Sequence, residues 1–386
     1  MELTIVGGGL AGLTAAIAGA ERGADVTLFE SHATLGGRAR STAPPYVAND
    51  GPHVLYGDGA PYAWLRRRGL VSPSKALPLR GALGARWRYR GRVGGPPAEV
   101  LGAATRRRLR APHDVDFGAW ATERLGAATA RAVANMMGVA LFDADPARLS
   151  AAFVWDRFQR VTAPRRPSAR YLIGGWGTWV DHLVEQARSR GVRIATRTRV
   201  DALPEGPTIV ATSLDAARSL LGDDGLRGES GHTLMVDLGL TRRRGDPFLV
   251  FDSDECGYLS RYSLVDPTLA PAGEDLVQAQ MPVRPGESRA DVRLRLETLL
   301  DAALPAWRER STWRREQMAR GRTGALDLPG RTWRDRPAID RGAGVYLAGD
   351  RVAAPGLLGE VALTSAVRAA TLATAPGNTR SAAPTR

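Results

Sequence analysis

Residues 3–30 decide the fold, and they read LTIVGGGLAGLTAAIAGAERGADVTLFE. Residues 3–6 form a short apolar run that is typical of a buried parallel strand. A glycine-rich turn follows, residues 13–22 have the composition of a helix, and residues 25–29 form a second apolar strand that ends at Glu30. This order predicts the strand, turn, helix and strand from which doubly wound α/β sheets are built.

The spacing of the glycines indicates what the turn binds. Gly7 permits the tight turn, Gly9 lets the backbone approach a pyrophosphate, and Gly12 lets the helix pack closely on the strand. At Leu10 and Ala11 the helix begins, where backbone N–H groups and the helix dipole favour a phosphate. The turn therefore predicts a dinucleotide cofactor.

The segment after the second strand adds polar groups for that cofactor. Glu30, with Ser31 beside it, is placed to accept hydrogen bonds from ribose hydroxyls. Gly36 and Gly37 allow a second close backbone approach, and the guanidinium of Arg38 offers a fork that matches a phosphate.

These motifs resemble a known superfamily. Residues 6–39, VGGGLAGLTAAIAGAERGADVTLFESHATLGGRA, are similar to the N-terminus of the flavin amine oxidase, protoporphyrinogen oxidase and phytoene desaturase superfamily. Within this superfamily the chain as a whole resembles the phytoene-desaturase-like branch most, because it lacks the lysine of many amine oxidases. The resemblance implies FAD as the cofactor and a contact of Arg38 with its pyrophosphate. Residues 49–54 resemble the stretch that passes the flavin ring, which assigns Pro52, His53 and Val54 to the cofactor site.

Two later segments resemble the same superfamily. Residues 171–178 precede an expected helix at 179–189 and expected strands at 191–194, 198–200 and 208–212, and the resemblance implies a backbone contact of Val200 with the adenine. Near the C-terminus, an expected strand at 345–348 is followed by Gly349 and Asp350, and a helix is expected at 361–370. The resemblance implies that Asp350 holds the ribityl or phosphate region.

The start of this last helix is expected to face the N1–C2=O edge of the flavin, because a helix N-terminus stabilises the negative charge of a reduced flavin. The residues assigned to this edge are Leu358, Gly359, Glu360, Val361 and Ala362. The superfamily usually has glycine where Val361 stands and often where Ala366 stands, so the geometry at the ring is expected to differ here.

Because cofactor motifs lie at both ends and in the middle, we expect a discontinuous FAD domain. The predicted fold is α/β, a two-dinucleotide-binding Rossmann domain of the glutathione-reductase type with an inserted α+β substrate domain. The expected FAD domain comprises residues 1–60, 172–228 and 337–378, and the substrate domain comprises residues 61–171 and 229–336. Residues 233–238 alternate apolar and polar side chains, which predicts a half-exposed sheet. Residues 379–386 are expected to be a disordered tail.

Composition limits the other classes. The formal charge is +13, but Lys75 is the only lysine, and the arginine-rich runs lack interleaved aromatic residues, so we expect no nucleic-acid partner. No apolar run is long enough to cross a bilayer, which leaves peripheral membrane contact open. The single cysteine, Cys256, fits a reducing cytoplasm and predicts a buried inert thiol. The sequence does not indicate the oligomeric state.

Few side chains are candidates for catalysis. The five histidines lack metal-ligand spacing, and neither a G-x-S-x-G elbow nor a P-loop is present, so we expect no metal site. His53 is the best candidate near the flavin, with a structural histidine as the alternative, and Trp176 either walls the cavity or packs in the core. A short list is compatible with catalysis, because the flavin carries the redox chemistry itself.

The predicted function is FAD-dependent dehydrogenation or desaturation of a C–C or C–N bond in a small or medium, largely apolar metabolite, with FAD held non-covalently. A carotenoid-type desaturase or isomerase is the first alternative, and a flavin-free carrier or escort protein on the same fold is the second. A dehydrogenase that uses only NAD leaves the C-terminal motif unexplained. The strand that includes residues 231–234 lacks the lysine of many amine oxidases of the superfamily, so amine oxidation is not expected.

Overall fold

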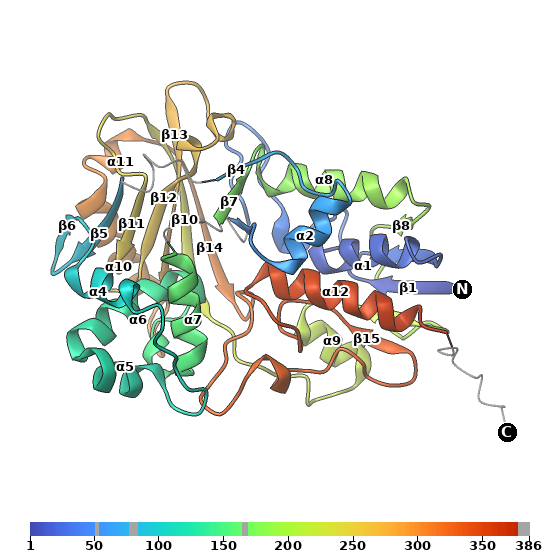
Figure 1. Cartoon of the computed structure of the whole chain (residues 1–386). Coiled ribbons are helices and arrows are strands. Elements are labelled where there is room, and N and C mark those ends of the chain that lie inside the picture. The colour runs from blue at the N-terminus through green and yellow to red at the C-terminus, as the bar shows by residue number, and fades with distance from the viewer. Residues whose placement is uncertain (51–53, 77–83, 164–168, 377–386) are drawn as a thin grey trace.

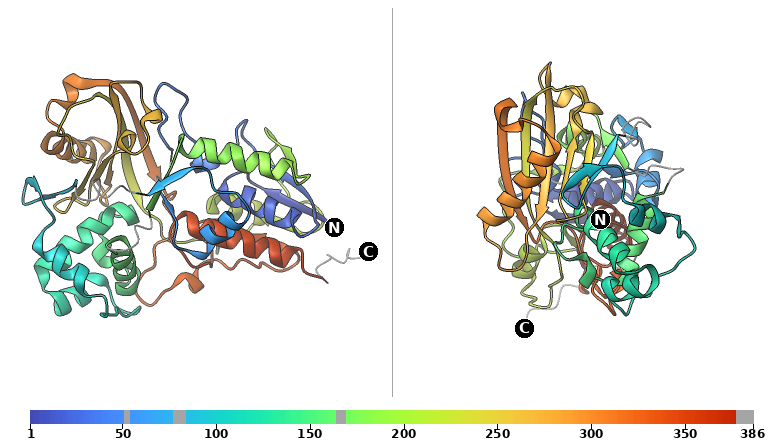
Figure 2. Two further views of the ribbon diagram at one scale, coloured as in Figure 1. Left: turned by 45° about the horizontal axis from the view of Figure 1, so that its top comes forward. Right: turned by 90° about the vertical axis from the view of Figure 1, so that its left-hand side faces the viewer.

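The computed structural model describes residues 1–50, 54–76, 84–163 and 169–376. A parallel sheet lies at the end of the molecule that holds the N-terminus, and a seven-stranded mixed sheet lies at the other end (Figures 1 and 2). The predicted α/β fold is thus confirmed, with a Rossmann-type sheet and a second, mixed sheet.

The parallel sheet has five strands in the order β8 (Arg193–Ala195), β2 (Asp25–Phe29), β1 (Glu2–Val6), β9 (Thr208–Val210) and β15 (Val345–Leu347). All four neighbouring pairs are parallel. The chain runs outward from β1 through β2 to β8 and then returns to the other side of β1. In such sheets, ligands bind at the carboxyl ends of the strands where the order reverses, which here is between β1 and β9.

Helices cover this sheet and build its core. They are α1 (Leu10–Ala20), α2 (Ala60–Arg67), α8 (Gly175–Arg188), α9 (Leu214–Leu221) and α12 (Gly359–Ala373). Helix α12 lies beside α1, which joins the last helix of the chain to the first (Figure 1). Alternate residues of β2 are buried, and so are three of the five residues of β1, as the apolar runs predict.

The second sheet is largely antiparallel. Its strands, in spatial order, are β14 (Ser311–Arg320), β10 (His232–Thr241), β13 (Glu274–Pro282), β12 (Tyr258–Arg261), β11 (Leu249–Asp252), β5 (Ala85–Tyr89) and β6 (Arg92–Gly94). Only β11 and β5 pair in parallel among the strands of this sheet that the structure describes.

Both faces of this sheet are covered. Helix α10 (Arg289–Ala303), followed by α11 (Trp307–Arg310), packs on one face. The opposite face meets a helical group of α4 (Ala98–Thr105), α5 (Phe117–Leu125), α6 (Ala127–Leu141) and α7 (Ala151–Val161). The prediction of a half-exposed sheet at residues 233–238 is therefore wrong, because residues 233–240 of β10 are buried on both faces. The burial of β10 depends on helices that are distant from it in the sequence, and the alternation of residues within the strand gives no information about those helices.

A small sheet joins the two parts. It consists of β3 (Leu55–Tyr56), β7 (Ala169–Leu172) and β4 (Ser74–Ala76). Short 3-10 helices occur at η1 (Gly37–Ala39), η2 (Pro146–Arg148), η3 (Tyr262–Leu264), η4 (Pro267–Leu269) and η5 (Trp333–Asp335).

Several predicted boundaries shift. Helices α1, α8 and α12 begin three, four and two residues earlier than the sequence predicts, and the prediction of a strand at residues 198–200 is wrong. That segment is irregular because Arg197 has a positive φ of 55°, which ends the extended run after β8. The domain division stays a prediction, and α2, at the expected start of the substrate domain, packs against α12 of the parallel-sheet part.

Candidate functional site

The turn after β1 is shaped by its glycines. Gly7 has a φ of +108°, and a Cβ at this position would lie 2.7 Å from the Ala211 carbonyl oxygen at the end of β9. A Cβ at Gly12 would lie only 1.8 Å from the carbonyl oxygen of Gly7, so helix and turn pack too closely for a side chain. Gly9 differs, because the nearest atom to its added Cβ is 4.0 Å away. Packing thus requires Gly7 and Gly12, whereas Gly9 borders open space.

Helix α1 begins at this open space. Gly9 is its N-cap, Leu10 and Ala11 form its first turn, and no side chain among the described residues caps it. The loop that contains Gly36 and Gly37 lies against the same end, since Gly9 and Gly36 form a bridge and the Gly36 N–H donates to the Gly8 carbonyl at 2.8 Å. An uncapped helix N-terminus flanked by glycine backbone is a binding site for a phosphate group.

Glu30 lies beside this turn at the end of β2 and is 8% exposed. Its carboxylate accepts hydrogen bonds from the backbone N–H groups of Gly8 and His32, each at 2.8 Å, and from the Ser31 hydroxyl at 3.2 Å. Burial alone would raise the pKa of Glu30, but these hydrogen bonds outweigh it and hold the pKa below its ordinary value. The carboxylate is therefore ionised at neutral pH, as an acceptor for ribose hydroxyls must be.

Arg38 and Asp350 meet across the chain. The guanidinium donates to both carboxylate oxygens, Nη1 to Oδ2 at 2.6 Å and Nη2 to Oδ1 at 2.9 Å. It also donates to the carbonyl of Arg322 at 2.5 Å. Burial would raise the pKa of Asp350, yet the charge of Arg38 lowers it below its ordinary value. The sequence predicts that both residues bind the cofactor, and the fold brings them into direct contact.

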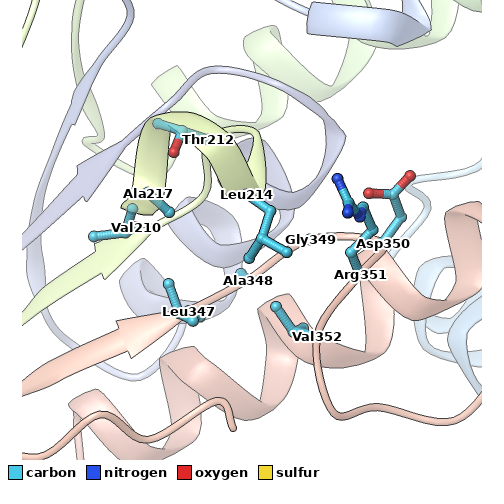
Figure 3. Close-up of a pocket in the computed structure, with 10 residues that line it drawn as sticks. All are labelled: Val210, Thr212, Leu214, Ala217, Leu347, Ala348, Gly349, Asp350, Arg351 and Val352. Atoms are coloured by element: carbon cyan, nitrogen blue, oxygen red, sulfur yellow. The ribbon is translucent and has the colours of Figure 1, made fainter. Parts of the chain in front are cut away.

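A small pocket lies next to this pair, at the carboxyl ends of β9 and β15. Its volume is about 10 Å³, which is the space of one water molecule. Figure 3 shows Asp350 and Arg351 beyond Gly349, to one side of apolar side chains that include Leu214 and Leu347. The pocket is too small for a cofactor, so we relate it to the packing of the strand ends.

The start of α12 is held from the other part of the molecule. Leu358 is the N-cap with a φ of 52°, and Gly359 opens the helix. The carboxylate of Glu360, 4% exposed, accepts the Leu357 N–H at 3.0 Å and two hydrogen bonds from Arg160 of α7, at 2.7 and 2.9 Å.

Val361 and Ala362 are buried at this helix start. Ala366, where the superfamily often has glycine, is 0% exposed in the core of the parallel-sheet part.

Arg160 also anchors the loop before α2. It forms hydrogen bonds with both oxygens of Asp58, and its guanidinium lies 4.5 Å from the centre of the Tyr56 ring. Burial raises the pKa of Tyr56 to about 12, so its hydroxyl stays protonated. This cluster links α7 to the N-terminus of α12.

The remaining predicted residues lie in different surroundings. Pro52 and His53 fall outside the described residues, Val54 is half-buried, and Val200 lies in the irregular segment after β8. Trp176 is 1% exposed and packs edge-on against Trp179 in the core, while its backbone N–H donates to the Asn49 side chain at 3.0 Å.

Cys256 is buried with its pKa raised by burial to about 12, which supports the prediction of an inert thiol.

Sequence reasoning missed a polar network on the second sheet. The Asp237 carboxylate, 1% exposed, accepts from Arg315 Nε at 2.7 Å and from Gln278 Nε2 at 2.6 Å. Arg315 reaches Asp50 and donates to the Asn49 carbonyl at 3.0 Å. Asp50 thus ties the segment before residues 51–53 to this sheet. Gln278 and Gln280, two residues apart in an otherwise apolar stretch, were the sequence feature that could have indicated this network.

Comparisons with known proteins agree with this geometry. Residues 5–67 match the family of NAD(P)-binding Rossmann-like domains. No curated protein sequence matches the chain.

Among solved structures, an oxidoreductase from Methanosarcina mazei superposes with a TM-score of 0.74 at 16% identity, covering 95% of this chain and 99% of the other. Cyclohexylamine oxidase from Brevibacterium oxydans superposes with a TM-score of 0.70 at 15% identity, covering 97% and 98%. The chain shares its fold with these two proteins. UDP-galactopyranose mutase in its reduced form is also similar, with a TM-score of 0.69 at 14% identity and coverage of 98% and 96%.

The residues present fit FAD. The uncapped start of α1, the open space at Gly9 and the ionised Glu30 are suited to an adenosine pyrophosphate. No cluster of potential metal ligands occurs among the residues that the structure describes. No helix in these same parts of the chain is long and apolar enough to cross a membrane.

Proposed function

We propose that this protein holds FAD non-covalently and removes hydride from a C–C or C–N bond of a small or medium, largely apolar metabolite. The observation that supports it best is the convergence of the α1 N-terminus, Glu30, and the Arg38–Asp350 pair at the carboxyl edge of one parallel sheet. That edge is where α/β sheets bind dinucleotides.

The proposed division of roles follows the charges. The α1 N-terminus and Arg38 bind the pyrophosphate, Glu30 orients the adenosine ribose, and Asp350 orients the ribityl chain. The first turn of α12, from Gly359, presents its N–H groups to the pyrimidine edge of the ring. Bound FAD supplies the hydride acceptor, a chemistry that no protein side chain offers.

The protein contributes binding, orientation and exclusion of water. His53 is the side chain that we propose nearest to the reaction, whereas the burial of Trp176 in the core favours a packing role for that residue. The Asp237–Arg315–Asp50 network positions the segment that leads to His53, since Arg315 contacts both Asn49 and Asp50. A buried network with every charge paired is suited to fixing one loop conformation.

One observation favours a second candidate function, a flavin-free carrier on the same fold. Arg38 and Asp350 form two hydrogen bonds with each other, so each charged group has a partner within the chain itself. A carrier would keep this pair closed, whereas an enzyme would open it to admit FAD.

The colour of the purified protein distinguishes the two. We expect a yellow protein with about one FAD per chain, and acid precipitation should release the flavin into the supernatant because no covalent bond holds it. A colourless protein that does not take up added FAD would contradict the proposal. A yellow acid precipitate would contradict non-covalent binding only.

A further inference from the structure

Side chains of the second sheet form two cross-strand rows on the face that meets the helical group. One row runs Gln317, Met235, Gln280, Tyr258, Phe251 and Trp87. The next row begins Arg315, Asp237, Gln278 and Ser260. Residues directly opposite one another on paired strands share a face, so each row lies on one face. The two rows are two residues apart on each strand, so they lie on the same face. One end of the face is thus polar and the other is aromatic.

Two amide groups in these rows lack a hydrogen-bond partner among the described residues. Gln278 is 3% exposed, and its Nε2 donates to Asp237 while its Oε1 is unpaired. Gln317 lies on β14, and its buried Nε2 is unpaired. Gln280 differs, because its Nε2 donates to the Val139 carbonyl of α6 at 2.8 Å. Buried amides are ordinarily satisfied, so an unpaired acceptor and an unpaired donor require an explanation.

The position of these groups points to a ligand. Arg315 and Gln278 both donate to the carbonyl of Asn49, at 3.0 and 3.5 Å. Asn49 directly precedes the segment that we expect beside the flavin. The Tyr258 and Phe251 rings are tilted against each other with their centres 5.8 Å apart, and the Phe251 and Trp87 rings are tilted with their centres 5.2 Å apart, so aromatic rings line this end of the face.

The charges of the face are already paired. Asp237 is paired with Arg315, and the side-chain atoms of these rows that lack a hydrogen-bond partner, which include Gln278 Oε1, Gln317 Nε2 and Trp87 Nε1, belong to neutral groups. An additional ionised group would face a site without a counter-charge, and burial of an unpaired charge is costly. A neutral ligand group is therefore favoured.

We infer that the substrate carries a neutral amide or lactam group, whose N–H donates to Gln278 Oε1 and whose C=O accepts from Gln317 Nε2, attached to a flat ring that packs against Tyr258, Phe251 and Trp87. This inference rests on the proposed function and specifies its substrate class. A pure hydrocarbon such as a carotene would leave both amides unpaired, so this chemistry disfavours the carotenoid alternative.

The test uses the FAD-loaded protein and matched pairs of ligands. Benzamide is compared with α-methylstyrene, which has the same shape without the amide, and 2-quinolinone is compared with naphthalene. Binding is followed by the change in the visible flavin spectrum and by the rise in melting temperature. We expect each amide to bind about tenfold more tightly than its hydrocarbon, as one or two buried neutral hydrogen bonds provide.

Variants assign the preference to the two glutamines. Gln278→Met and Gln317→Met keep the side-chain volume, and each should reduce the amide preference to less than about threefold. Gln317→Met should leave the melting temperature of the ligand-free protein unchanged or higher, because it removes an unpaired donor. The matched control is Gln159→Met on α7, where Nε2 donates to the Ala103 carbonyl and Oε1 is likewise unpaired. This control should retain the full preference.

The outcomes separate the two proposals. A protein that cannot bind FAD contradicts the proposed function. A protein that binds FAD but binds amide and hydrocarbon equally, or binds neither amide, overturns this inference alone. Retention of the amide preference in both Gln278→Met and Gln317→Met also overturns it.

Discussion

Arg38 and Asp350 are 312 residues apart in sequence, yet they form a two-pronged ion pair at 2.6 and 2.9 Å. Arg38 belongs to the loop after β2 and Asp350 follows β15, so the pair closes the carboxyl edge of the parallel sheet across its β1–β9 reversal. Each residue is also predicted to contact FAD. We therefore expect that binding of FAD exchanges this ion pair for contacts with the phosphate and the ribityl chain.

The first prediction concerns Arg38→Ala. Loss of its charged hydrogen bonds to the pyrophosphate should weaken FAD binding by about 10- to 100-fold. Arg38→Lys should recover only part of this, because an ammonium lacks the planar fork. Equilibrium dialysis of the apoprotein with FAD measures the change. Arg199→Ala is the control, since Arg199 pairs with Asp201 at a site where both side chains are at least 75% exposed. Equal FAD affinity in Arg38→Ala and Arg199→Ala would remove Arg38 from the site.

Two glycines three residues apart should respond in opposite ways. Gly12→Ala places a Cβ 1.8 Å from the Gly7 carbonyl and should destabilise the fold by about 1–3 kcal/mol or prevent folding. Gly9→Ala meets nothing closer than 4.0 Å, so its melting temperature should equal that of the FAD-free wild-type protein, while FAD binding is lost because the methyl group occupies the space for the pyrophosphate. Thermal melting and flavin content separate the two effects. A Gly9→Ala protein with full flavin content would show that phosphate does not approach there.

Glu30→Gln should reveal a pH-dependent contribution to stability. The pKa of Glu30 is lowered in the folded protein, because hydrogen bonds to its carboxylate outweigh the effect of burial. Its stabilisation is therefore complete above the unfolded-state pKa of about 4.3 and is lost as the pH falls through the folded-state pKa.

Without FAD, we expect the variant to be less stable by about 1.5–3 kcal/mol at pH 7, and the difference should shrink below about pH 4. Urea unfolding at both pH values provides the measurement, with Glu2→Gln on the exposed start of β1 as the control. A difference that is constant with pH would contradict the role of the ionised carboxylate.

Arg160→Met tests the cluster at the start of α12. Glu360 would keep its buried position without its cation, and removal of one partner from a buried pair costs about 3–5 kcal/mol. Because the Arg160 side chain is 26% exposed, we expect the lower end of this range in urea unfolding. Arg193→Met, which removes a pair with Asp25 where both side chains are more than half exposed, should be nearly neutral. A similar loss of unfolding free energy in the two variants would mean that water solvates the Glu360 carboxylate once Arg160 is removed.

The last prediction concerns amines. No lysine lies on β10, and Lys75, the only lysine in the sequence, is exposed on β4. We therefore expect that simple amines and polyamines do not reduce the flavin, and that photoreduced protein reoxidises slowly in air. Anaerobic stopped-flow mixing with primary and secondary amines provides the test. Rapid bleaching followed by fast reoxidation in air would place the protein among the amine-oxidising enzymes.

Local patterns predicted the parallel-sheet part more accurately than the second sheet. The strand at residues 25–29 lies where the apolar run ends at Glu30, because a short strand with one buried and one half-buried face needs little more than apolar composition. The strand predicted at residues 198–200 is absent because Arg197 has a positive φ, which interrupts the extended backbone. An arginine in the sequence does not predict a positive φ. The prediction of a half-exposed sheet at residues 233–238 was wrong because alternating polar and apolar residues indicate only one buried face. They do not show that another element, such as α10, covers the second face.

By itself the sequence determined the glycine turn after the first strand and the acid at position 30 that ends the second strand, since both depend on residues close together in the chain. Only the tertiary structure decided which distant groups meet: Arg38 with Asp350, Arg160 with Glu360, and Asp237 with Arg315 and Gln278. The physical reason is that a pairing partner is selected by strand order, register and helix packing. These place side chains hundreds of residues apart within hydrogen-bond distance, and no local spacing encodes that separation.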